Sequence, residues 1–146
     1  MSRKRLIFFA DHGDTSRSHP VWTAYHFALE AHRANLDVEI RLAADAIEIF
    51  KRERPIVAKH SDDLGRSMRE AVDRGLMVSV PHVSEALAGY MHEAADRGVF
   101  VSVCDGCATR QSLTDADLKR WGAVRRLLKD ILTEVADGQS ELIYLG

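Results

Sequence analysis

Short apolar runs alternate with amphipathic stretches along this chain, and that alternation constrains the fold more than any other feature. The apolar runs that predict strands cover residues 5–10, 38–42, 99–103 and 142–145. Helical spacing of apolar residues covers residues 20–35, 83–97 and 124–136, with a further helix start at Thr114. Strands that alternate with helices predict an α/β fold, with a mostly parallel sheet that helices cover on both faces.

An internal echo supports this reading of the chain. Residues 70–80 (EAVDRGLMVSV) closely match residues 93–103 (EAADRGVFVSV). Each copy predicts a helix that ends on a basic residue, a glycine in the left-handed cap and an apolar strand. Residues 76–80 are therefore expected to be a strand or an extended segment, and residues 51–61 an exposed loop.

Length and composition set the class of protein. The 146 residues suffice for a single domain over residues 1–146, and a formal net charge of −2 gives no reason to expect nucleic acid or an anionic membrane as partner. The apolar run at residues 6–10 is too short for a signal peptide or a membrane span. We therefore expect a cytoplasmic protein, whose thiols are mostly reduced.

The first candidate for chemistry is Cys104, which follows a predicted strand directly. Ligands of open α/β sheets bind at the carboxyl ends of the strands. If a helical turn begins near Gly106, its free amide groups and the charge of Arg110 would favour a thiolate at Cys104. The alternative is a buried and inert core cysteine.

Cys107 lies three residues after Cys104, and these are the two cysteines of the chain. This spacing permits a local disulfide, a resolving thiol or two ligands of a zinc site, which His12, His60 or His82 could complete. A single pair is weak evidence for zinc, so we expect no bound metal. The sequence has neither a Gly-x-Gly-x-x-Gly nor a Walker pattern, and we expect no cofactor.

Two further positions are candidate ligand-binding residues. Asp11 and His12 follow the first strand, in a loop that opens at the carboxyl edge of a parallel sheet, and His12 could exchange a proton near neutral pH. His82 takes the place in the first copy of the echo that Cys104 and Asp105 take in the second. The alternative for Asp11 and His12 is an ordinary polar turn.

Taken in order, these motifs resemble the DsrE/DsrF-like family, which includes the sulfur-relay proteins DsrE and TusD. The first matching features are the opening strand with its polar loop (residues 5–19), the alanine-rich helix (21–34) and the next strand (36–42). The others are the run that ends at Cys104 with Cys107 and Arg110 downstream (97–110) and the closing segment (127–145). The resemblance covers nearly the whole chain except roughly residues 50–80.

The resemblance implies a flavodoxin-like three-layer α/β sandwich that assembles as trimers, hexamers or mixed complexes. It also implies that Cys104 carries a persulfide and hands sulfur to a partner protein. Two functional hypotheses follow. The first is a sulfur-handling protein, with a persulfide carrier or sulfurtransferase-like activity at Cys104. The second is a non-catalytic oligomeric binding module that holds a small ligand or a metal near Cys104 and Cys107.

Overall fold

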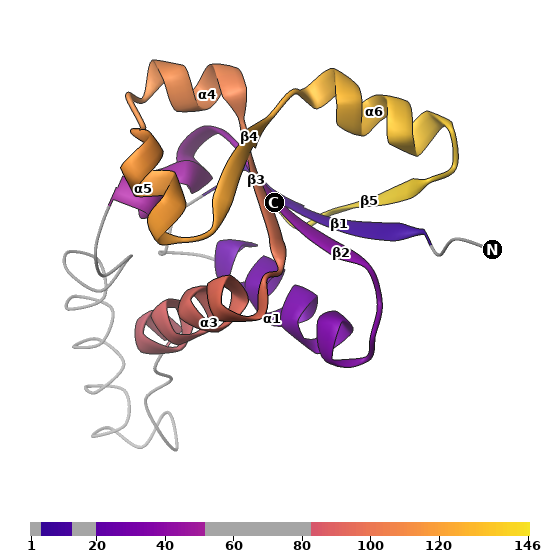
Figure 1. Cartoon of the computed structure of the whole chain (residues 1–146), viewed down its shortest axis with the longest axis horizontal. Helices are drawn as coiled ribbons and strands as arrows, with labels where there is room; N and C mark the ends of the chain where they lie inside the picture. The colour runs from indigo at the N-terminus through magenta and orange to yellow at the C-terminus, as the bar shows by residue number, and fades with distance from the viewer. Residues whose placement is uncertain (1–3, 13–19, 52–82) are drawn as a thin grey trace, which may run out of the picture.

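The described residues form a five-stranded parallel sheet at the centre of the structure (Figure 1). The computed structural model describes residues 4–12, 20–51 and 83–146. The strand order is β4-β3-β2-β1-β5. The strands are β1 (Arg5–Ala10), β2 (Val38–Leu42), β3 (Phe100–Cys104), β4 (Ala123–Arg126) and β5 (Ser140–Tyr144).

Helices lie on both faces of this sheet, which gives the expected three-layer α/β sandwich. Figure 1 shows α1 and α3 side by side on one face and α6 on the opposite face. The helices are α1 (Pro20–Arg33), the 3₁₀ helix η1 (Ala44–Lys51), α3 (Val83–Arg97), α4 (Asp105–Arg110), α5 (Asp115–Arg120) and α6 (Leu128–Ala136). Because β4 and β5 are the two edge strands, the connection through α6 returns the chain across the whole sheet.

The two faces of the sheet differ in polarity. Side chains alternate along a strand, and one set of alternate positions on β1, β2 and β3 is apolar and buried, next to the face that α1 and α3 cover: Phe8, Ala10, Val38, Ile40, Leu42, Val101 and Val103. Each fully buried large aliphatic side chain contributes about 1.5–3 kcal/mol. The other set on β2 and β3 includes the buried polar residues Glu39, Arg41 and Ser102.

The sequence predicted most of these elements. The predicted strands at residues 5–10 and 38–42 match β1 and β2, and a capping box at Thr114 confirms the helix start there. The strand predicted at 99–103 is shifted by one residue, so that Cys104 is the last residue of β3. The strand predicted at 76–80 and the loop after Lys51 lie outside the described residues.

One prediction was wrong. Val124 was assigned to an amphipathic helix that continued to residue 136, but it lies in β4, and α6 begins only at Leu128. Gly122 adopts a φ of 65° and ends α5, and the chain then pairs with β3 in register Val101 to Ala123. Pairing with a neighbouring strand overrides the helical spacing of these few residues. None of the helices in the described ranges is long and apolar enough to cross a membrane.

Gly122 provides a test of this turn. Gly122→Ala should destabilise the protein by about 1 kcal/mol, because a Cβ is unfavourable at positive φ. Gly89→Ala is the matched control, since Gly89 lies exposed within α3 with no atom in the path of a Cβ, and it should stabilise by about 0.5 kcal/mol. Urea unfolding of the two variants measures both effects. Equal stabilities would contradict the assigned turn.

Candidate functional site

Cys104 lies where β3 ends and α4 begins. It has an extended backbone conformation, with φ −60° and ψ 122°, and it occupies the N-cap position of α4. The residue is half-buried and its thiol is free. The candidate nucleophile is therefore not sealed in the core, and it lies at the carboxyl edge of the sheet as the sequence predicted.

The surroundings of Cys104 favour the thiolate. Burial raises the pKa of the thiol, but this effect is outweighed by hydrogen bonds from the backbone N–H and the side chain of Cys107. The charge of Arg41 and the backbone N–H of Gly106 act in the same direction. The pKa of Cys104 consequently lies below the ordinary value for a thiol, which increases the fraction present as the nucleophilic form near neutral pH.

Arg41 is a buried cation that the sequence analysis did not identify. It lies on β2 and is only 1% exposed. Its Nη1 atom donates hydrogen bonds to the carbonyl oxygens of Val103, at 3.2 Å, and Arg126, at 2.8 Å. Val103 precedes Cys104, and Arg126 is its register partner on β4. The guanidinium thus extends from β2 across the end of β3, where Cys104 lies, to the end of β4.

A buried carboxylate organises the polar face next to Arg41. The Oε2 atom of Glu39 accepts a 2.6 Å hydrogen bond from the hydroxyl of Ser102, and its Oε1 atom lies 2.7 Å from Nη1 of Arg126. Arg126 also binds Glu134 of α6, and this hydrogen bond lowers the pKa of the Glu134 carboxyl. These contacts connect β2, β3, β4 and α6 on one face of the sheet.

The predicted loop residues Asp11 and His12 lie at the same edge of the sheet but do not reach the thiol. The His12 side chain is 63% exposed, and its Nδ1 atom lies 2.6 Å from Oδ1 of Asp11. The hydroxyl of Tyr144 donates to the same oxygen at 2.8 Å. Since β2 separates β1 from β3, the backbones of the two sites are roughly 10 Å apart, which is two strand spacings.

The remaining predicted residues are placed differently. Cys107 lies in the first turn of α4 and contacts Cys104, as the spacing suggested. Arg110 is exposed at the end of the same helix, six residues from Cys104. His82 and His60 lie outside the described residues. No group of three or more His, Cys, Asp or Glu side chains within the described ranges could hold a metal ion.

The sequence did contain a signal for Arg41. In Val38–Leu42, Glu39 and Arg41 alternate with three apolar residues, so both charges point to one face of a strand that is central in the sheet. Two charges of opposite sign on one face of a central strand indicate a buried ionic network, because an isolated buried charge is strongly unfavourable.

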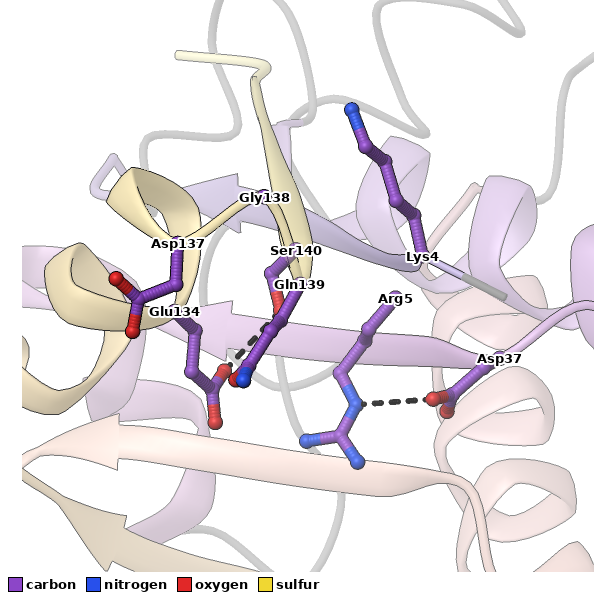
Figure 2. Close-up of a pocket in the computed structure, with 8 residues that line it drawn as sticks. All are labelled: Lys4, Arg5, Asp37, Glu134, Asp137, Gly138, Gln139 and Ser140. Atoms are coloured by element: carbon purple, nitrogen blue, oxygen red, sulfur yellow. Dashed lines mark hydrogen bonds and ion pairs between the residues drawn. The ribbon is translucent and has the colours of Figure 1, made fainter. Parts of the chain in front are cut away.

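A cavity of about 380 Å³ lies at the opposite edge of the sheet (Figure 2). It lies beside the first residues of β1 and β5, Arg5 and Ser140, and two of its charged groups, Arg5 and Asp37, form an ion pair. Figure 2 shows Arg5 directed toward Asp37, at 3.4 Å, and Ser140 donating to Glu134, at 3.1 Å. The described residues that line the cavity include no thiol or imidazole, so the candidate chemistry remains at Cys104.

Comparisons with known proteins establish the fold. No family model and no curated protein matches the chain. Among solved structures, the chain is similar to the ychN protein from E. coli, with a TM-score of 0.60 at 14% identity over 97% of this chain and 98% of that one. It is also similar to BT1422, a conserved protein of unknown function from Bacteroides thetaiotaomicron, with a TM-score of 0.54 at 12% identity over 97% and 94%. The likeness confirms the flavodoxin-like three-layer architecture.

The depressed pKa of Cys104 predicts a distinct reactivity profile. In the native protein, alkylation of Cys104 by iodoacetamide should persist to lower pH than in the urea-unfolded chain, because the folded state stabilises the thiolate. Mass spectrometry of the Cys104 peptide, after alkylation at a series of pH values, measures both profiles. Coincident profiles, or a native profile displaced to higher pH, would contradict the prediction.

Proposed function

We propose that the protein carries sulfur as a persulfide on Cys104. The observation that supports this most directly is the half-buried Cys104 thiol at the carboxyl edge of the sheet, where local N–H groups and a buried guanidinium favour its anion. The resemblance of the sequence around Cys104 to the DsrE/DsrF-like sulfur-relay proteins supports the same proposal. Thiol chemistry of this kind suits a reducing compartment such as the cytoplasm.

The proposed transfer needs no external oxidant or reductant. The Cys104 thiolate attacks the terminal sulfur of a donor persulfide and forms a new S–S bond. The S–S bond of the donor breaks, and its electron pair leaves on the donor's own sulfur as a thiolate. In the second half of the cycle, an acceptor thiolate attacks the terminal sulfur on Cys104 in the same way and returns Cys104 to its thiolate form.

The neighbouring residues have auxiliary parts in this proposal. The Cys107 thiol donates a hydrogen bond to the Cys104 sulfur and therefore lies within reach of it. Arg110, at the exposed end of α4, and Asp11 with His12, at the exposed end of β1, are positioned to meet a partner protein that docks at the carboxyl edge. His82 remains a prediction of the sequence.

Sulfur loading tests the proposal. The purified, reduced protein is treated with a small-molecule persulfide, and its intact mass is measured. Wild type should gain one sulfur atom, Cys104→Ala should gain none, and Cys107→Ala should still gain one, because the carrier atom remains. Tryptic mapping should locate the added sulfur on the Cys104 peptide.

The control variant makes the result specific. Cys107→Ala retains a single thiol, so unreactive wild type, or equal loading of Cys104→Ala and Cys107→Ala, would overturn the carrier role. If the persulfide does not load but zinc copurifies with wild type and is lost in the double Cys→Ala variant, the alternative of a metal-binding module is supported instead.

We further propose that copies of this chain assemble through the face covered by α6. Eight large apolar side chains are exposed among the described residues, and six of them lie on or beside β4, α6 and β5: Val124, Leu127, Leu128, Leu132, Leu142 and Tyr144. A concentration of this kind on one face is typical of a protein–protein contact. The family resemblance implies a trimer or a hexamer.

The assembly can be tested by placing charges within this face. Leu128→Glu combined with Leu132→Glu should convert an oligomeric wild type to monomers, since both side chains are about half exposed and would be buried in a contact. Light scattering after size-exclusion chromatography measures the mass. Leu36→Glu, at an exposed apolar position between α1 and β2, should leave the mass unchanged. A monomeric wild type would contradict the assembly.

A further inference from the structure

We propose that Arg41 is the positioning residue that keeps the Cys104 sulfur anionic, both as the free thiolate and as the persulfide. The persulfide half of this inference rests on the proposed function, whereas the thiolate half rests on the geometry alone. Arg41 acts on Cys104 from β2, across the end of β3, and none of the described carboxylates forms an ion pair with it.

The first observation is the position of the guanidinium. Nη1 of Arg41 donates to the carbonyl oxygens of Val103 and Arg126 and, at 3.4 Å, to the hydroxyl of Ser102. These three acceptors surround the end of β3. They fix the cation one residue from Cys104 on β3 and beside its register partner on β4.

The second observation is that the charge of Arg41 is not neutralised by contact. All three acceptors of Nη1 are uncharged groups, and none of the carboxylates in the described ranges forms an ion pair with Arg41. Its Nε–H is buried and finds no hydrogen-bond acceptor among the described residues. A buried guanidinium that lacks an ion-pair partner favours the anionic form of a nearby group.

Glu39 is the nearest alternative counter-charge, but its oxygens are already engaged. Oε1 is held by Arg126, at 2.7 Å, and more distantly by Arg5, at 3.5 Å, while Oε2 accepts from Ser102. Ser102 thus stands between the Glu39 carboxylate and the Arg41 guanidinium. Glu39 therefore forms no ion pair with Arg41, although its charge acts on the guanidinium through space.

The arginines of β4 make the contrast clear. Arg126 contacts two carboxylates, Glu39 and Glu134, and Arg125 lies 3.6 Å from Asp105. Both β4 cations therefore have carboxylate partners of their own. On α4, Cys107 contacts Cys104, and η1, which packs on α4, carries the exposed charged residues Asp45, Glu48 and Lys51. Arg41 remains the buried cation whose charge is available to the sulfur.

The rate at which Cys104 is alkylated should therefore depend on Arg41. Removal of a cation makes the thiolate less stable, so the alkylation profile of Cys104 should move to higher pH in Arg41→Met. At a pH on the rising part of the wild-type profile, the alkylation rate should fall about tenfold, the smallest effect expected when one nearby opposite charge is lost. Arg41→Lys retains the charge and should recover most of the rate.

The experiment compares full alkylation profiles of wild type, Arg41→Met, Arg41→Lys and two further arginine variants. Arg97→Met is the matched control, because Arg97 pairs with Glu93 at the end of α3, beyond the opposite end of β3, and its profile should match wild type. Arg110→Met compares the two candidate cations directly, and it should have a smaller effect than Arg41→Met. Circular dichroism confirms that each variant is folded before its profile is used, and Arg41→Lys against Arg110→Met provides the comparison if Arg41→Met does not fold.

The outcomes separate this inference from the proposed function. Three results would overturn the role of Arg41, even if wild type still loads sulfur. The first is an unchanged profile in Arg41→Met, and the second is a loss of rate in Arg41→Lys as large as in Arg41→Met. The third is an effect of Arg110→Met that equals or exceeds that of the Arg41 variants. A wild type that takes up no sulfur would overturn the carrier function, while the shifted profile would still support Arg41 as the residue that keeps the thiolate. A lower rate of sulfur loading in Arg41→Met than in Arg41→Lys supports both.

Discussion

A carboxylate buried in the centre of a parallel sheet is the constraint on which the rest of this structure depends. Glu39 is fully buried on β2, and an unpaired charge in such a position would destabilise the fold by several kcal/mol. Its oxygens therefore need the hydroxyl of Ser102 and the guanidinium of Arg126, which join β2 to β3 and β4. Ser102 in turn accepts from Arg41. Through Ser102, this network includes the buried cation Arg41, which lies next to the end of β3, where Cys104 is found.

The same constraint explains why the sheet has two unlike faces. The face under α1 and α3 is apolar and closed, and it supplies most of the hydrophobic core. The other face has charged groups at its centre, and among the described residues α6 lies across it, with apolar side chains of β4, α6 and β5 exposed at its margin. An apolar margin of this kind is suited to a subunit contact, in which the exposed apolar side chains would supply the free energy of association.

Sequence reasoning located the thiol but not the cation, and the reason is physical. Periodicity and capping preferences report local structure. They could therefore locate the strand that ends at Cys104, Gly98 before that strand and the turn after it. Arg41 is 63 residues away, and only strand pairing brings β2 next to β3. Arg110 was the natural choice from the sequence because it is close along the chain. β4 was missed for a related reason: four residues are too few to show a strand period, and their pairing with β3 is a tertiary effect.

A cation that acts on the sulfur without a hydrogen bond to it is well matched to sulfur transfer. A carrier thiol must be ionised near neutral pH, yet intrinsic nucleophilicity falls as the pKa falls, so that the best attacking thiol has a pKa near the ambient pH. The acceptors of Nη1 in Arg41 are oxygen atoms of the strand ends rather than the sulfur. Its charge therefore favours the anion through the field of a buried group, without adding to the hydrogen bonds that Cys107 and Gly106 already donate to the sulfur. A hydrogen bond from the same guanidinium to the sulfur would stabilise the thiolate more and make it a weaker nucleophile.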